Sequence, residues 1–131
     1  MIMAIVNIER TEDGFVATNG RGGQISIGGP ESDFTPVELL LAALGGCEIV
    51  TVEPLTAQRG HRLVKLAVTV SAEKIRPNKL GPITATYDVV LPEGDDGEVF
   101  RSVAHRVHDR HCTVGTALRE ETETIQVLPE A

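Results

Sequence analysis

The chain has 131 residues, 41% of them hydrophobic, which is enough for one globular domain with a buried core. Acidic residues outnumber basic ones by 19 to 12, giving a formal charge of −7, and no dense basic run offers a surface for phosphates. Nucleic acid is therefore not an expected partner. The first residues lack a basic n-region and a small-residue cleavage site, and we expect no apolar run long enough to span a bilayer. The sequence predicts a cytoplasmic protein with no membrane contact.

Three short segments open the chain and read as antiparallel strands. Ile2 to Glu9, Gly14 to Thr18 and Gln24 to Ile27 are β-branched or alternating, and glycine-rich turns separate them. This part of the chain is expected to form a meander.

A long helix is predicted from Pro36 to about Arg59. Thr35 and Glu38 form a T-x-x-E capping box at its start. Leu39 to Leu44 are all apolar and cover every side of the helix, so its first half should be buried all round. Pro54 should kink or interrupt it about one turn earlier.

Two alternating strands, a second helix and a last strand complete the pattern. The strands run from 64 to 71 and from 83 to 91, joined by the loop RPNKLGP. A helix from Glu98 to about Arg110 precedes a short piece from Cys112 to Arg119, and Thr124 to Leu128 closes as a strand. The order β-β-β-α-β-β-α-β predicts an α+β fold in a single domain over residues 1–131.

Two glycines stand directly before Cys47 in the apolar part of the long helix. Each costs about 1 kcal/mol in a helix interior, so Gly45 and Gly46 should admit a neighbouring group close to the Cys47 sulfur. Alternatively, they only permit close packing, and Cys47 is a small core residue. Thr51, one turn later, is expected to satisfy a helix carbonyl.

The other cysteine, Cys112, follows a helix and opens the turn CTVGTAL. Free N–H groups there would stabilise a thiolate, although an inert cysteine in a helix connection fits equally well. In a reducing compartment, two cysteines far apart in sequence are more typical of free or redox-active thiols than of a structural disulfide.

A metal site is a further alternative. His105, His111 and Cys112 each lie three or four residues from His108, a spacing that can place His108 and any one of them on one helical face as zinc ligands. The run lacks a recognised ligand signature, and the charged residues between the histidines are typical of a solvated face. No metal or other cofactor is therefore the preferred expectation.

The motifs PVELLLAALGGC with Thr51, HCTVGTAL and the upstream ATNGRGG resemble the osmotically inducible protein C and organic hydroperoxide resistance family (OsmC/Ohr). The glycine pair is most similar to the OsmC-like branch. The resemblance covers nearly the whole chain and implies an antioxidant thiol peroxidase acting on organic hydroperoxides in the oxidative stress response. It also implies an intertwined homodimer with active sites at the subunit interface.

Carried over by position, the resemblance makes Cys47 the peroxidatic thiolate and Cys112 the resolving thiol. It places Arg21 near the reactive sulfur and implies reduction of the resulting disulfide by a dithiol such as a lipoyl group. The Ohr branch has a glutamate ten residues before its cysteine, where this chain has Val37. Glu38 stands one residue later, about 13.5 Å along the helix from Cys47 and on the opposite face, so it would act across the dimer interface.

Three other positions depart from the family pattern. Thr113 and Gly115 replace a proline and a serine after the second cysteine, which predicts a looser turn. Glu48 follows Cys47 where the Ohr branch has an aromatic, and it puts negative charge near the thiol and removes apolar substrate surface. Both effects oppose an efficient alkyl peroxidase. A non-catalytic dimer that binds a small ligand or thiol therefore remains the alternative within the same fold.

Overall fold

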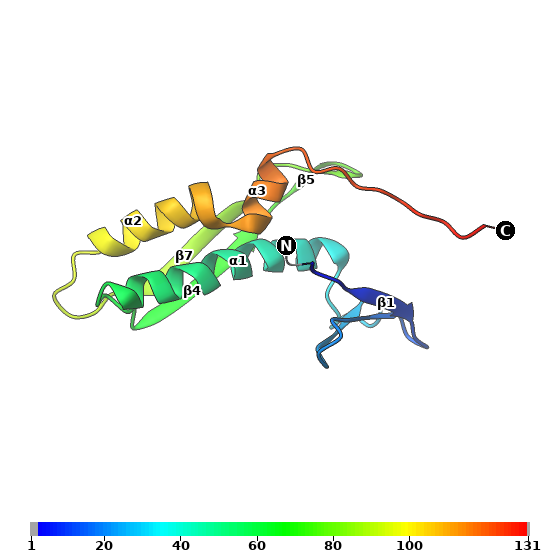
Figure 1. Cartoon of the computed structure of the whole chain (residues 1–131), viewed down its shortest axis with the longest axis horizontal. Coiled ribbons are helices and arrows are strands. Elements are labelled where there is room, and N and C mark those ends of the chain that lie inside the picture. Colours follow the sequence, from blue (N-terminus) through cyan, green and yellow to red (C-terminus); the bar gives the residue numbers. More distant parts are fainter. Residues whose placement is uncertain (1–2, 131) are drawn as a thin grey trace. The chain divides into compact units, whose positions relative to one another are not determined.

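The computed structural model describes residues 3–130 and has the mixed α+β architecture that the sequence predicts (Figure 1). Antiparallel strand pairs and three α-helices succeed one another along the chain. The chain divides into two compact units, one within the first 41 residues and one from Ala42 onward. Each unit is described by itself.

The first unit contains the predicted meander. Strands β1 (Asn7–Arg10), β2 (Phe15–Thr18) and β3 (Gln24–Ile27) form an antiparallel sheet with β2 in the centre. Phe15 of β2 pairs with Arg10 on one side and with Ile27 on the other. The three predicted strands are confirmed, although the first begins at Asn7, and Ile2 lies outside the described residues.

This small sheet leaves its apolar side chains exposed. Ala17 is the only buried residue between positions 3 and 41. Ile8, Phe15 and Ile25 have between 46% and 60% of their surface exposed. A three-stranded sheet normally gains its stability from a covered hydrophobic face, so these residues are typical of a surface that packs against something else.

Helix α1 (Pro36–Gln58) begins with the predicted capping box. The Thr35 N–H donates to Glu38 Oε1 at 2.9 Å, and the Glu38 N–H donates to Thr35 Oγ1 at 3.1 Å. Pro54 does not interrupt the helix as predicted: α1 continues past it to Gln58. Proline removes the donor for the carbonyl of Val50, but Val50 is exposed, and water can satisfy a carbonyl there.

The predicted burial of the first half of α1 on all sides is wrong. Within the second unit, the fully buried stripe at four-residue spacing consists of Leu44, Glu48, Val52 and Thr56, whereas Ala42 and Ala43 are exposed. The helix packs through one face only, so its remaining apolar residues keep part of their surface exposed.

Helix α1 is also long and apolar enough to cross a membrane, judged by length and composition only. The expectation that no apolar run reaches this length is therefore wrong. The core helix of a soluble protein meets the same criterion, and α1 carries the buried, hydrogen-bonded Glu48 on its packed face.

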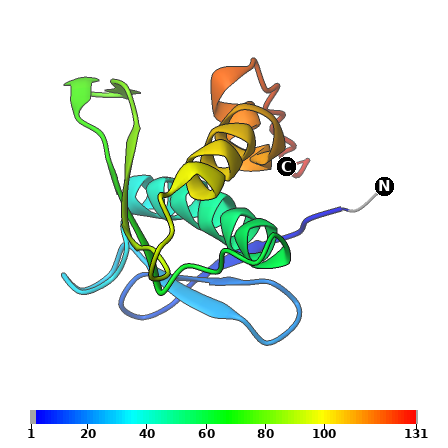
Figure 2. The same ribbon diagram turned by 90° about the vertical axis from the view of Figure 1, so that its left-hand side faces the viewer.

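In the second unit, strands β4 (Lys65–Ser71) and β7 (Thr84–Val90) form an antiparallel pair against which α1 packs (Figure 2). The contact is close at Gly45, where an added Cβ would lie 2.7 Å from Val70 Cγ2 and 3.2 Å from Val68 Cγ1. The glycine therefore lets α1 approach β4. The predicted loop between these strands contains a further hairpin, β5 (Lys74–Arg76) and β6 (Lys79–Leu80).

Helix α2 (Glu98–Arg106) continues into a π-helical turn, η1 (Val107–His111), and α3 (Thr113–Arg119) follows. The core joins α1 to this region through the buried residues Leu44, Val52, Leu63, Val103, Val107 and Cys112. The predicted last strand, Thr124 to Leu128, is not formed: the segment is exposed and pairs with no strand within residues 3–130. A β-branched sequence forms a strand only where another strand pairs with it.

Candidate active site

The fold brings the two cysteines into contact. Cys47 is half-buried on α1, and Cys112 has no exposed surface. Both are free thiols, and Cys47 packs against the core cluster that contains Cys112, close enough to raise the pKa of the Cys112 thiol. Two cysteines that are far apart in sequence thus lie near each other within the second unit, and their redox roles stay predictions.

The π-helical turn is what directs Cys112 into the core. The buried residues of α2 and η1 are Val103 and Val107, four positions apart, and a regular α-helix would next bury His111. Instead the Cys112 N–H donates to the Val107 carbonyl at 2.9 Å, which inserts one extra residue into the turn. The buried position therefore passes to Cys112, and His111 is exposed.

The environment of Cys112 opposes its ionisation. Burial raises the pKa of the Cys112 thiol and outweighs the Gly115 N–H, which donates to Cys112 Sγ at 3.2 Å and lowers the pKa. The neighbouring Cys47 thiol and the Glu48 carboxylate raise the pKa of Cys112 further. The N–H group predicted at the start of the helix is present, but burial outweighs its effect on the pKa of Cys112.

The turn after Cys112 is well ordered in spite of its unusual residues. Thr113 begins α3, and the Thr116 N–H donates to the Cys112 carbonyl at 2.9 Å. An added Cβ at Gly115 would lie 3.2 Å from Cys112 Sγ, so the glycine allows the backbone N–H to approach the sulfur. The looser turn stays a prediction.

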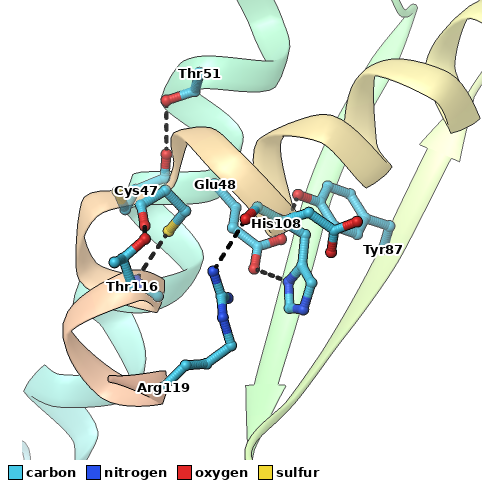
Figure 3. A network of polar contacts seen from close by, with 10 residues as sticks. Cys47, Glu48, Thr51, Tyr87, His108, Thr116 and Arg119 are labelled. Carbon is cyan, nitrogen blue, oxygen red and sulfur yellow. Dashed lines mark hydrogen bonds and ion pairs between the residues drawn. The ribbon is translucent and has the colours of Figure 1, made fainter. Parts of the chain in front are cut away.

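Glu48 is the most unusual group near the thiols, because it is a carboxylic acid with only 2% of its surface exposed. Tyr87 Oη donates to Glu48 Oε1 at 2.8 Å, and His108 Nδ1 lies 3.0 Å from Glu48 Oε2 (Figure 3). These bonds offset the several kcal/mol that burying a carboxylate costs. Burial and the neighbouring Glu48 in turn raise the pKa of Tyr87 above its ordinary value.

From the sequence, Glu48 is expected only as a charge beside a thiol, and its hydrogen bonds with Tyr87 and His108 are not predicted. A signal was available for Tyr87, the only tyrosine in the chain, which occupies an inward-facing position of an alternating strand. Glu48 also lies four residues from the buried Leu44 and Val52, which predicts a partner for it on the packed face.

The zinc alternative is wrong for the residues that the structure describes, among which no three His, Cys, Asp or Glu side chains gather as a metal site. Cys112 faces the core, while His105 and His111 are exposed. The ring of His108 is instead bonded to Glu48.

Arg21 and Glu38 belong to the first unit. Arg21 lies in an exposed turn, where its backbone N–H donates to Asn19 Oδ1 at 2.9 Å, and Glu38 serves the capping box. Their roles at the thiols remain predictions. Thr51 does what was expected, since its hydroxyl donates to the Cys47 carbonyl at 2.9 Å.

The α+β fold thus places one buried and one half-buried free cysteine near the buried Glu48. The model of the family described as OsmC-like protein matches residues 29–126, so the chain belongs to the OsmC-like family. A comparison with curated proteins finds no match.

Solved structures support the same fold. An OsmC-like protein from Mycoplasma pneumoniae superposes with a TM-score of 0.76 at 19% identity, covering 92% of this chain and 89% of that one. A hypothetical protein from Aquifex aeolicus VF5 superposes with a TM-score of 0.76 at 19% identity. The match covers 93% of this chain and 91% of that one. An OsmC-like protein of unknown function from Vibrio cholerae O1 superposes with a TM-score of 0.69 at 16% identity. The match covers 92% of this chain and 94% of that one.

Proposed function

We propose that this protein is a cysteine-based peroxidase that reduces organic hydroperoxides. The Cys47 thiolate attacks the terminal peroxide oxygen, the O–O bond breaks, and the alkoxide leaves as an alcohol after taking up a proton. Cys47 becomes a sulfenic acid, and the Cys112 sulfur displaces its hydroxyl as water to form a disulfide. A dithiol such as a lipoyl group then reduces the disulfide and is itself oxidised.

The observation that carries this proposal is the contact between the two thiols in the core. Cys47 is the more exposed of the two, which suits the sulfur that meets substrate, while Cys112 is fully buried beside it. Burial raises the pKa of the Cys112 thiol, which suits a resolving thiol that reacts only after Cys47 has been oxidised.

The proposal includes a cytoplasmic homodimer in which Arg21 supports the reactive sulfur and Glu38 acts from across the interface. The exposed apolar residues of the first sheet support such a dimer, because a second copy would remove them from water. Sedimentation of the native protein tests the dimer. A monomer across the micromolar range would contradict it.

The peroxidase proposal is tested by intact mass and peptide mapping before and after one equivalent of cumene hydroperoxide. We expect a Cys47–Cys112 disulfide in near-stoichiometric yield, and a sulfenic acid on Cys47, trapped by dimedone, in Cys112→Ser. The Cys47→Ser protein is the matched control and should leave the peroxide unreduced. Two thiols that stay reduced in the native protein would overturn the proposal.

A second candidate function is a non-catalytic dimer that binds a small ligand or thiol. The observation that favours it is Glu48, whose negative charge lies next to the thiols and raises the pKa of Cys112. The two functions differ in the reactivity of Cys47. Rapid alkylation of Cys47 at pH 6 favours the peroxidase, and sluggish alkylation favours the binding protein.

A further inference from the structure

The second unit contains an open hollow of about 280 Å³ that is lined by residues of β7, α2 and η1 and by Glu48 of α1. Its size is close to the lower end of the range for small-ligand sites, about 300 Å³. Cys47 and Cys112 do not line it. The lining includes Glu48, Tyr87, Phe100, Arg101, His105 and His108.

The polar groups on one side of the hollow are already satisfied. Both Glu48 oxygens accept hydrogen bonds, from Tyr87 and from His108 (Figure 3). A carboxylate acceptor fixes the shared proton on His108 Nδ1, which leaves Nε2 as the ring nitrogen without a bond to Glu48. The hydrogen-bond partners of Glu48 are therefore already in place, and its negative charge disfavours a ligand that carries two negative charges.

The rim of the hollow carries the Arg101 guanidinium and the His105 ring, and Arg101 is near enough to Asp95 to help lower the pKa of that carboxyl. Arg101 and His105 are exposed and one helical turn apart on α2. Arg101 Nη2 donates to the Asp96 carbonyl at 3.1 Å, and within residues 3–130 neither side chain forms an ion pair with a carboxylate. In a protein with a formal charge of −7, such a rim is a specific place for a negative group.

The remaining wall is apolar. Phe100 contacts Tyr87 edge to face, with ring centroids 5.7 Å apart, and Ala85 and Ala104 line the hollow beside them. Small side chains next to two rings leave room for a short alkyl chain or one aromatic ring.

We propose that this hollow binds a small amphipathic monocarboxylate, with its carboxylate on Arg101 and His105 and its apolar part against Phe100 and Tyr87. The planar guanidinium matches a carboxylate in a two-point contact. A phosphate dianion fits less well, because its larger charge would lie near the buried Glu48. The site does not depend on the peroxidase function, since neither cysteine takes part in it.

The test uses the full chain labelled with nitrogen-15 and titrated with phenylacetate at constant ionic strength. We expect saturable amide shifts centred on α2 between Phe100 and His105. The neutral analogue 2-phenylethanol should bind about ten-fold or more weakly, because it lacks the charge-assisted bonds. Inorganic phosphate should not displace phenylacetate at equal concentration.

Two variants separate the site from general charge. Arg101→Gln should weaken phenylacetate binding about ten-fold or more, whereas Arg106→Gln, on the same helix but outside the hollow, should change it less than about two-fold. Both side chains are exposed, so neither substitution should disturb the fold. Amide spectra that match those of the native protein will verify this. The proposal would be overturned if phenylacetate showed no saturable binding, or if its amide shifts were centred on Cys47. It would also be overturned by equal effects of the two variants, by tight binding of the neutral analogue, or by displacement with phosphate.

Discussion

The two glycines before Cys47 should respond in opposite ways to the same small change. Gly45→Ala puts a methyl group 2.7 Å from Val70 Cγ2 and 3.2 Å from Val68 Cγ1. Valine is stiff at χ1, so α1 or β4 must shift, and overpacking of this kind costs about 1–3 kcal/mol. At Gly46, an added Cβ meets nothing within 4 Å.

Both substitutions gain about 1 kcal/mol of helix propensity, so this contribution cancels between the two variants. The Gly45→Ala protein should therefore be less stable than the Gly46→Ala protein by the packing cost alone, about 1–3 kcal/mol in the free energy of unfolding. Each kcal/mol corresponds to a difference of roughly 4 °C in melting temperature. Urea unfolding at two protein concentrations, with the native chain as reference, measures this difference.

Equal stability of the two variants would refute the packing argument for Gly45. A Gly46→Ala protein that is itself destabilised, with a midpoint that depends on protein concentration, would show that a second copy packs against Gly46. That result would support the proposed dimer and would correct the view of Gly46 as an open position.

Three further outcomes follow from the second unit. Tyr87→Phe removes one of two donors to the buried Glu48 and should lower the free energy of unfolding by about 1.5–3 kcal/mol in urea; an unchanged midpoint would mean that water replaces the hydroxyl. The hydrogen bond from His61, at 2.8 Å, is the main cause that lowers the pKa of Asp95. The ionised Asp95 therefore stabilises the fold above about pH 4, and this stabilisation is lost as the pH falls through the pKa of Asp95 in the folded protein. Asp95→Asn should therefore flatten the acid side of the stability curve, and an unchanged curve would contradict this. Because burial raises the pKa of Cys112, iodoacetamide should label Cys112 slowly in the native protein at pH 7 and quickly in denaturant, and peptide mapping that finds equal rates would refute its burial.

Local sequence determined most of the elements. The capping box at Thr35 and Glu38 and the alternation from 83 to 91 appear in the structure as expected, because caps and strand periodicity depend on residues a few positions apart. The cysteine motifs also indicated the family, since they keep their order and spacing along the chain.

Contacts between distant segments decided the rest. No local pattern predicts that one extra residue in the turn after Val107 buries Cys112 in place of His111, because a π turn is stabilised by what it packs against. In the same way, Glu48 is acceptable in the core only because Tyr87 and His108 reach it from other elements. The segment from 124 to 128 has a strand sequence but pairs with no strand within residues 3–130. The sequence by itself thus determined the elements and the two thiols, while tertiary packing decided which side chains surround those thiols, because burial and hydrogen-bond partners come from segments that the local sequence does not specify.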